Sequence, residues 1–503
     1  MNSIEAPEAF GAKHRLSLFV IVSLILFSGY AAFDLEAANT VTIAARDTVT
    51  GHFDWLLTTT VSLVLLVAFV VALLPQASRR LGHDDERPEF SRWSWFAMLF
   101  SAGLASGLVY WGAAEPITHF GTNPFSGDGA DPQSAATTAV TITVFHWGLH
   151  GWGLYAVAGL AIAVSAYRGN KPLTFSTAFV PLLGERMVES AVGRTIDVLA
   201  LYGTVFGVAT SIGLAVASMN ATIEPLSGLP FTLTSQIAIV ILVCALGVLS
   251  VLSGVAKGIR RLSELNVWLS MALVLTIVVV GPTAWILQSL PTNAADYAIN
   301  VIPMGFWVAD EPVGQAWQTA WTVFYWGWWL AWTPFVAMFI ARISRGRTIR
   351  EFILGVLFVP VLVVVSWMTV FGGTALHQEM ADAGSISGPV AADYGLGLVA
   401  MIDQLANSYL HTALLAVIAF LLFTWLITSL DSATLVICHI LKVQDNGSMK
   451  VLWGVVLGAV TCTLMLIGGI QALQAASIII GLPLAVLMLL ICVAAIKLVV
   501  AKG

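Results

Sequence analysis

Residues 321–352 read WTVFYWGWWLAWTPFVAMFIARISRGRTIREF, an apolar run of helical length that ends among four arginines. About 20 apolar residues are enough to cross the hydrocarbon core of a bilayer as a helix. Similar runs recur along the 503-residue chain, of which 58% is hydrophobic and only 10% charged. Soluble proteins carry about 25% charged residues, so this composition is too poor in charge to cover a water-exposed globule. We predict an all-α integral membrane protein, because the alternating runs of a membrane β-barrel are absent from the sequence.

The apolar runs give twelve candidate spans, and an even number places both termini on one side of the membrane. The predicted spans are 15–33, 54–75, 92–114, 136–166, 194–218, 233–254, 263–288, 316–341, 350–373, 408–437, 451–469 and 472–499. With the N-terminus inside, every Lys and Arg except Arg46 falls in an inner loop or tail. Because positively charged loops stay cytoplasmic, both termini are predicted to be cytoplasmic.

Two short matches suggest an internal duplication. The third and eighth spans share Tyr-Trp-Gly, at 110–112 and 325–327, and the fifth and tenth share Thr-Ser, at 210–211 and 428–429. The near-equal offsets pair the third to seventh spans with the eighth to twelfth. Five spans is an odd number, so the two units would have opposite topology, which is the inverted-repeat plan of many secondary transporters. Chance also explains two short matches, so the residues alone leave this open.

Helical phasing gathers most rings of the eighth span on one face. At 100° per residue, an arc of roughly 80° holds Trp317, Trp321, Tyr325, Trp328 and Trp332. Trp329 lies at the edge of this arc, and Trp326 faces elsewhere. One interpretation is an interfacial aromatic belt, although a belt clusters at the water boundary and this stripe runs into the span. The other is a cage for a quaternary ammonium or sulfonium group, which donates no N–H and is held by cation–π contact.

The fourth span carries a second aromatic cluster, HWGLHGWGLY at 146–155. Trp152 and Tyr155 are three residues apart and share a helix face, whereas Trp147 joins them only if the helix bends. The three glycines of the cluster permit such a bend. His146 and His150 are four residues apart and suit a metal pair by spacing alone. With no third ligand nearby in the sequence, we expect no metal site.

The third span reads SAGLASGLVYWGAAEP at 101–116. Gly103 and Gly107 form a small-xxx-small pattern, which is typical of close helix packing. The alternative is a locally unwound helix whose free backbone groups meet substrate and ions. We interpret Glu115, near the outer end and followed by Pro116, as a surface or capping residue.

The tenth span reads TWLITSLDSAT at 424–434. Thr428 and Ser429 offer hydroxyl oxygens at membrane depth, and sodium prefers several oxygen ligands. Asp431 is a rare intramembrane charge and is therefore a functional-site hypothesis. The alternative is that the hydroxyls bond back to their own helix and that Asp431 lies near the cytoplasmic end.

These motifs together resemble the betaine/choline/carnitine transporter (BCCT) family over nearly the whole chain. The resemblance rests on 321–352, HWGLHGWGLY, the glycine segment before Tyr110 and TSLDSA, in matching order and spacing. It implies a leucine-transporter-like fold, in which two N-terminal helices precede two inverted five-helix repeats, and commonly a homotrimer. The implied divisions are a tail and two spans at 1–90, a first repeat at 91–290, an extracellular connecting segment with a possible interfacial helix at 291–315, and a second repeat at 316–503.

The resemblance also implies site residues. Its aromatic box matches Trp147, Trp152, Tyr155, Trp326, Trp328, Trp329 and Trp332. Its glycine segment, expected to meet the substrate, matches Gly103, Ala105 and Gly107. Its sodium site matches the hydroxyls of Thr428 and Ser429 with backbone carbonyls of Ser101, Leu104 and Trp425.

Three departures from the family pattern bear on ion coupling. Ala105 stands where sodium-coupled members usually carry the middle glycine of Gly-x-Gly-x-Gly. The position where some sodium-independent exchangers carry an arginine matches Asn266, so no built-in cation replaces the ion. A second sodium site of some members uses two threonines, which match Thr204 and Val208; valine has no hydroxyl, so this second site is doubtful here.

The expected function is sodium symport of a betaine-like zwitterion by alternating access, with sodium as coupling ion and no other cofactor. The alternative is sodium-independent exchange or proton-coupled uptake of choline; carnitine and dimethylsulfoniopropionate carry the same kind of onium group. The spans contain no GxSxG, HExxH or paired catalytic carboxylates, so we expect no enzyme. The expected partners are a small onium substrate, sodium and the lipid bilayer, with no nucleic acid. The expected location is the bacterial inner (plasma) membrane, with many spans.

Overall fold

The protein is all-α in the computed structural model, which describes residues 12–103, 105–127, 129–252, 256–405, 408–441 and 447–501. These residues contain no strand, only an isolated β-bridge between Arg80 and Thr348. The predicted fold class is therefore confirmed. The first elements are α1 (Ala12–Phe33), α2 (Leu35–Leu73), η1 (Pro75–Ser78), α3 (Arg92–Gly103), α4 (Ala105–Gly121), α5 (Pro132–Trp147), α6 (Leu149–Tyr167), η2 (Ser176–Phe179), α7 (Val180–Leu183), α8 (Glu185–Val188), α9 (Ala191–Ser227), α10 (Leu233–Leu252) and α11 (Ala256–Val280).

The remaining elements form the eighth and later predicted spans and the segments between them. They are α12 (Thr283–Gly305), α13 (Pro312–Gln318), η3 (Thr319–Val323), α14 (Phe324–Ile343), α15 (Ile349–Trp367), η4 (Met368–Gly372), α16 (Gly373–Ala381), α17 (Ser387–Ala392), η5 (Tyr394–Leu396), α18 (Gly397–Leu405), α19 (Ser408–Ile440) and α20 (Gly447–Val500). Here η3 and η4 are π-helical turns. Each interrupts a predicted span without ending it.

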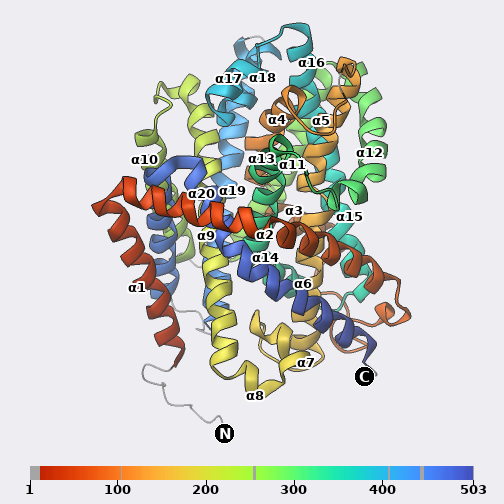
Figure 1. Cartoon of the computed structure of the whole chain (residues 1–503), viewed down its shortest axis with the longest axis vertical. Helices are drawn as coiled ribbons and strands as arrows, with labels where there is room; N and C mark the ends of the chain where they lie inside the picture. Colours follow the sequence, from red (N-terminus) through yellow and green to blue (C-terminus); the bar gives the residue numbers. More distant parts are fainter. Residues whose placement is uncertain are drawn as a thin grey trace.

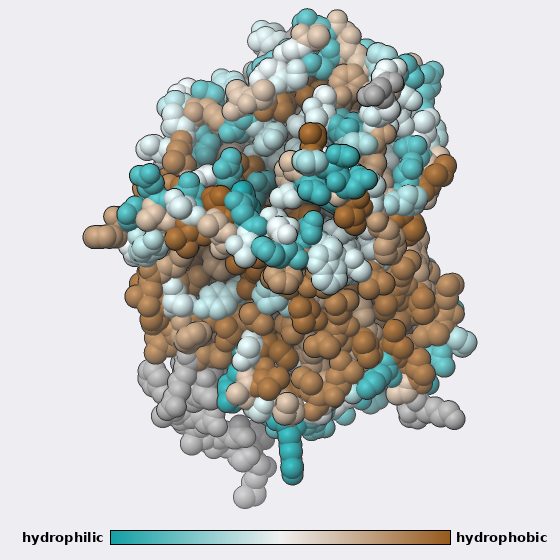
Figure 2. Space-filling model, in the orientation of Figure 1, coloured by the Kyte–Doolittle hydropathy of each residue, from teal (hydrophilic) through white to brown (hydrophobic). Residues whose placement is uncertain are grey.

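The outer surface has the pattern of a protein surrounded by lipid. Figure 2 shows brown hydrophobic residues in a broad band, with teal hydrophilic residues gathered toward the upper end. Large apolar side chains stand exposed on several long helices, such as Leu26, Leu275 and Leu362, each more than 60% exposed. Water would penalise so much apolar surface, whereas a bilayer does not.

Eight described helices are long and apolar enough to cross a membrane, or nine if the bent pair α11–α12 is counted as one span. α20 is one of these eight, although Gly468 and Gly469 have non-helical backbones that divide it into two helices. α3 and α4 are each too short to be among them, and Leu104 between them lies outside the described residues. Every predicted span coincides with one or more helices, and the count of twelve stays a prediction.

Two helices have limits that the apolar runs did not indicate. α2 begins at Leu35, well before the predicted start at 54, and Asp34 caps it by accepting from the Ala37 amide. α11 ends at Val280 rather than at 288, because Gly281 and Pro282 follow it and the chain turns by 118° into α12.

The middle of the bundle is built around α14. Its contacts are mainly with α6, α9 and α20. In Figure 1, α1 begins and α20 ends toward the lower end of the molecule, while α16, α17 and α18 lie at the upper end. The predicted repeat and domain boundaries stay predictions.

Candidate functional site

A break between α5 and α6 brings the fourth-span aromatic residues together. Gly148 separates the helices with a non-helical backbone (φ −95°, ψ −138°). The freed amide of Leu149 donates to the hydroxyl of Tyr297 on α12 (N···O 2.8 Å). A Cβ at position 148 would lie 2.4 Å from that hydroxyl oxygen, so only glycine fits here. The bend predicted from the glycines is therefore present.

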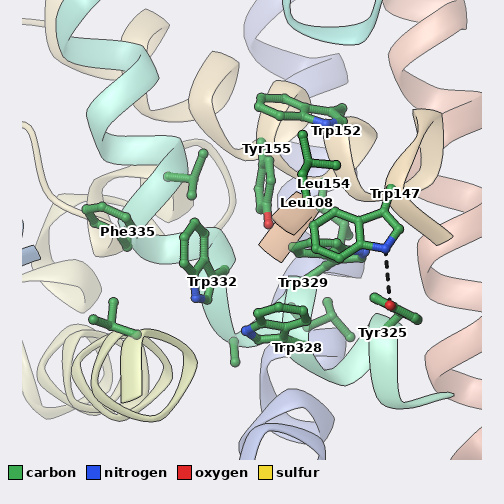
Figure 3. Packing of buried hydrophobic residues seen from close by; sticks show 14 of the residues in the cluster. Leu108, Trp147, Trp152, Leu154, Tyr155, Tyr325, Trp328, Trp329, Trp332 and Phe335 are labelled. Atoms are coloured by element: carbon green, nitrogen blue, oxygen red, sulfur yellow. Dashed lines mark hydrogen bonds between the residues drawn. The ribbon is translucent and has the colours of Figure 1, made fainter. Parts of the chain in front are cut away.

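Four rings from α5, α6 and α14 form an aromatic box, which we define as Trp147, Trp152, Tyr155 and Trp329. Trp147 meets Trp329 at 5.1 Å between ring centroids and 77° between planes. Tyr155 is perpendicular both to Trp329 (6.4 Å) and to Trp152 (5.5 Å). All four are at least 97% buried. Figure 3 shows them as a group with their ring planes turned to one another. Such mutually perpendicular rings are the arrangement from which an onium cage is made.

Two further α14 tryptophans continue the box toward α9. Trp328 stacks on Trp329 at 4.9 Å with only 9° between the planes. Trp332 lies perpendicular to Trp328 at 6.5 Å. Figure 3 places both beside the box, with Phe335 beyond them. Trp328 therefore adjoins Trp329 directly and Trp332 lies one ring further on, and their role as substrate-binding residues stays a prediction.

The indole N–H groups hold the box in place by bonding away from it. Trp329 donates to the His146 carbonyl oxygen (2.7 Å), and Trp328 to that of Gly207 (3.3 Å). In contrast, the hydroxyl of Tyr155 and the Nε1 of Trp332 have no hydrogen-bond partner among the described residues, although both are buried. Buried polar groups without partners are uncommon in folded proteins and suit a polar ligand group.

The structure does not bring Trp326 to the box. Its ring stacks on His150 (5.3 Å, 28°) and meets the edge of Phe145 (5.2 Å, 75°). His146 adjoins both tryptophans, because its ring meets the edge of Trp326 (6.2 Å, 78°) and its carbonyl oxygen accepts from Trp329. His150 is thus occupied by packing and is not paired with His146, so the spacing of these two histidines does not produce a metal pair.

Part of the glycine segment can be placed. A Cβ at Gly107 would lie 2.3 Å from Cη2 of Trp147, so the absence of a side chain at 107 lets this indole sit against α4. Gly103 ends α3 and Ala105 begins α4. The side chains of Ser101 and Ala105, and the whole of Leu104, lie outside what the structure describes.

A π-helical turn in the eighth span was not foreseen. η3 inserts between α13 and α14, and it shifts Trp317 and Trp321 relative to the rings of α14. Both rings contact His119, at 5.3 and 4.6 Å. π turns occur frequently at functional sites, but apolar periodicity carries no signal for them.

Glu115 is not the surface or capping residue that the sequence suggested. α4 continues to Gly121, so Glu115 lies inside a helix, and its side chain is fully buried. Its Oε2 accepts from Trp147 Nε1 (2.9 Å) and from the Tyr325 hydroxyl (2.5 Å). Its Oε1 pairs with His146 Nδ1 (2.6 Å) and His119 Nε2 (3.3 Å). The carboxylate therefore joins three predicted spans directly behind the box.

Glu115, His119 and His146 are also close enough together to be considered as a metal site, with ligand atoms within 4.8 Å of one another. Two ligands at about 2.1 Å from one ion in tetrahedral geometry are roughly 3.4 Å apart. Oε1 and His146 Nδ1 are only 2.6 Å apart, the distance of a direct hydrogen bond. The three groups satisfy one another as they stand, so the arrangement favours a hydrogen-bonded cluster.

The predicted sodium ligands of the tenth span lie on α19, which contacts both α3 and α4. The Thr428 hydroxyl donates to the Trp425 carbonyl oxygen (3.0 Å), so two predicted ligand oxygens are adjacent. Ser429 is half-buried beside them. Thr424, one residue before Trp425, donates to Oδ1 of the fully buried Asn266 on α11 (2.8 Å). Asn266, the position where some sodium-independent exchangers carry an arginine, is thus adjacent to the segment that holds the predicted sodium ligands.

Thr204, the remaining residue of the doubtful second sodium site, donates to the carbonyl oxygen of Ala200 one turn earlier (2.8 Å). Its neighbour at 208 is a buried valine without a ligand atom. The pair offers a single hydroxyl already bonded to its own helix, which does not favour an ion there.

A cavity of about 740 Å³ opens beside the box rather than within it. It lies between α2, the α13–η3 segment and α20, and Arg46, Asp47 and Asp54 line it. Phe324 also lines it and stacks on Trp328 (5.5 Å, 14°). A continuous stack of rings thus connects this cavity to Trp329.

The fold and the site define a multi-span helical membrane protein with an aromatic box in its interior. Comparison with known proteins names the group: the family model for the betaine/carnitine/choline transporters (BCCT) matches residues 15–502. The chain belongs to this family of transporters, which confirms the resemblance and the expectation of a transporter rather than an enzyme.

Similar proteins match this chain over most of its length. A probable glycine betaine transporter of Desulfitobacterium hafniense is 36% identical over 96% of this chain and 97% of its own. The glycine betaine transporter OpuD of Bacillus subtilis is 37% identical over 95% and 93%. A glycine betaine/proline/choline transporter of Vibrio parahaemolyticus is 37% identical over 89% and 83%.

Proposed function

We propose that this protein imports a betaine-like zwitterion, with glycine betaine as the first candidate, by sodium symport and alternating access. The observation that carries the proposal is the perpendicular contact of Trp147 and Tyr155 with Trp329. An onium group has no N–H to donate, so ring faces are the groups that recognise it. The names of the similar transporters support glycine betaine as substrate.

The polar end of a zwitterion needs hydrogen-bond donors. We assign backbone amides of the glycine segment, 103–107, to its carboxylate. The unpartnered Tyr155 hydroxyl and Trp332 Nε1 are further donors close to the box. A choline hydroxyl would use these groups less fully than a carboxylate, which accepts several hydrogen bonds.

Sodium is assigned to Thr428, Ser429 and the Trp425 carbonyl, with carbonyls of Ser101 and Leu104 completing the site from the third span. The contact of α19 with α3 and α4 supports this assignment. An ion held between these helices would favour the arrangement that closes around substrate, which couples the two ligands. We also propose a homotrimer in the bacterial inner membrane, with both termini cytoplasmic.

Uptake into proteoliposomes with sodium replaced by another monovalent cation tests the coupling. We expect accumulation of labelled glycine betaine only with an inward sodium gradient. Undiminished uptake without sodium would contradict symport and favour the alternative, a sodium-independent exchanger or a proton-coupled choline transporter. Competition experiments then rank the candidate substrates by affinity, with a panel of glycine betaine, choline, carnitine and dimethylsulfoniopropionate.

A further inference from the structure

The buried carboxyl group of Glu115 has no Lys or Arg partner among the residues that the structure describes. It is fully buried, and its ion-pair partners within the described part of the chain are two histidines, His119 and His146. Burying a carboxylate away from water is costly unless donors and an opposite charge compensate it. The hydrogen bonds supply the donors, and the opposite charge remains to be identified.

The hydrogen-bond pattern shows which atoms donate to Glu115. Trp147 Nε1 has a proton and no lone pair, so it donates, and Oε2 accepts. Trp147 also donates to the Tyr325 hydroxyl oxygen (3.1 Å), which leaves the Tyr325 proton for the same Oε2. Oε2 therefore carries no proton, and we take the group as ionised, with His146 Nδ1 donating to Oε1.

The two donors to Oε2 are also the rings behind the box. Trp147 contacts Trp329 and Trp328 edge to face, at 5.1 and 5.8 Å. Tyr325 lies 6.0 Å from Trp329 and 5.6 Å from Trp147. A negative charge at their polar ends polarises the indole and the phenol, and in this buried setting its field is weakly screened.

We propose that Glu115 provides the counter-charge of the onium group, acting through Trp147 and Tyr325 as a positioning residue. The inference rests on the proposed function and deepens it, since it identifies the substrate's positive charge as what Glu115 recognises. A cage of rings alone recognises the shape of the onium group and adds only a modest cation–π attraction. A buried carboxylate behind the rings makes the site discriminate a trimethylammonium group from a neutral group of the same shape.

The test compares two ligands that differ in this charge alone. Glycine betaine carries a trimethylammonium group, and 3,3-dimethylbutanoate carries a neutral tert-butyl group in its place on the same carboxylate. Dissociation constants for both are measured by tryptophan fluorescence titration of the purified full-length protein in nanodiscs. For Glu115→Gln we expect glycine betaine to bind about tenfold more weakly, which is the effect expected from losing one partly screened charge. The dissociation constant of 3,3-dimethylbutanoate should change less than about twofold.

Two variants separate charge from structure. Glu115→Asp keeps the charge, so the ratio of the two dissociation constants should stay near the wild-type ratio even if both ligands bind more weakly. Thr322→Val removes the hydroxyl next to His146 Nε2 (3.1 Å), on the far side of the cluster, and should leave the ratio unchanged. If Glu115→Gln is not recovered folded, Glu115→Asp decides the matter, because loss of discrimination with the charge retained would contradict the proposal.

The outcomes also separate this inference from the proposed function. Equal weakening of both ligands by Glu115→Gln, or unchanged betaine affinity, would overturn the counter-charge while leaving betaine transport intact. A wild-type protein that binds neither ligand would overturn the proposed function and the counter-charge together.

Discussion

Two tryptophans of α14, Trp329 and Trp326, have different surroundings. Trp329 meets Trp147 and Tyr155 edge to face, forms the box with them and stacks on Trp328. Trp326, three residues earlier, lies flat on His150 and against Phe145, and its Nε1 has no partner among the described residues. Both rings are buried, so burial does not distinguish them. The two rings therefore differ in the rings that they contact, and the proposed onium site depends on that difference.

The largest effect on uptake is expected at Gly107, where Trp147 of the box packs against α4. Gly107→Ala places a methyl group within 2.3 Å of Trp147, so the indole must leave its position against Glu115 and Trp329. We expect glycine betaine uptake to fall by at least about tenfold, as expected when a misplaced group disrupts a binding geometry. The control is Gly29→Ala on α1, where the added methyl group meets nothing within 4 Å. Equal uptake by the two variants would remove the argument that Trp147 must sit against α4.

The next effect tests the box itself. Trp329→Leu keeps the position apolar and removes the ring that four neighbouring rings contact. We expect the affinity for glycine betaine to fall by about 1–2 kcal/mol, roughly 5- to 30-fold, if cation–π contact holds the onium group. Fluorescence or calorimetric titration measures it. Unchanged affinity would mean that Trp329 only packs.

A smaller effect is expected at the proposed ion site. Thr428→Val removes the hydroxyl next to the Trp425 carbonyl, so the sodium concentration for half-maximal uptake should rise several-fold. Thr434→Val is the matched control, because Thr434 lies on the same helix and likewise donates to a carbonyl three residues earlier, that of Asp431 (2.9 Å). A rise of equal size in both variants would show a general effect on α19 rather than a ligand at 428.

The smallest effect on binding is expected at Trp326, which lies outside the box. Trp326→Leu should leave betaine affinity within about twofold of wild type. Because it empties buried volume beside His150 and Phe145, it should lower the free energy of unfolding by about 1–3 kcal/mol. Thermal unfolding and ligand titration on one preparation measure both quantities. A loss of affinity like that of Trp329→Leu would contradict the distinction between the two tryptophans.

Helical phasing predicted much of this from sequence. It set Trp326 apart from Trp328 and Trp332, and the glycines after Trp147 indicated the bend at Gly148. It failed at Glu115, because the apolar run ends at 114 while the helix continues, so the residue was assigned to the membrane surface. Periodicity also gave no sign of the π turn at η3 or of the long start of α2. These depend on contacts between distant segments, such as Glu115 with Tyr325, that no local pattern records.

The most direct test of the central claim is a cryo-electron microscopy structure of the protein with glycine betaine bound. We predict density for the trimethylammonium group in contact with Trp329, Trp147 and Tyr155, and not with the ring of Trp326. Density seated on the Trp326 and His150 side, or confined to the cavity beside Phe324, would contradict the assignment of the aromatic box as the onium site.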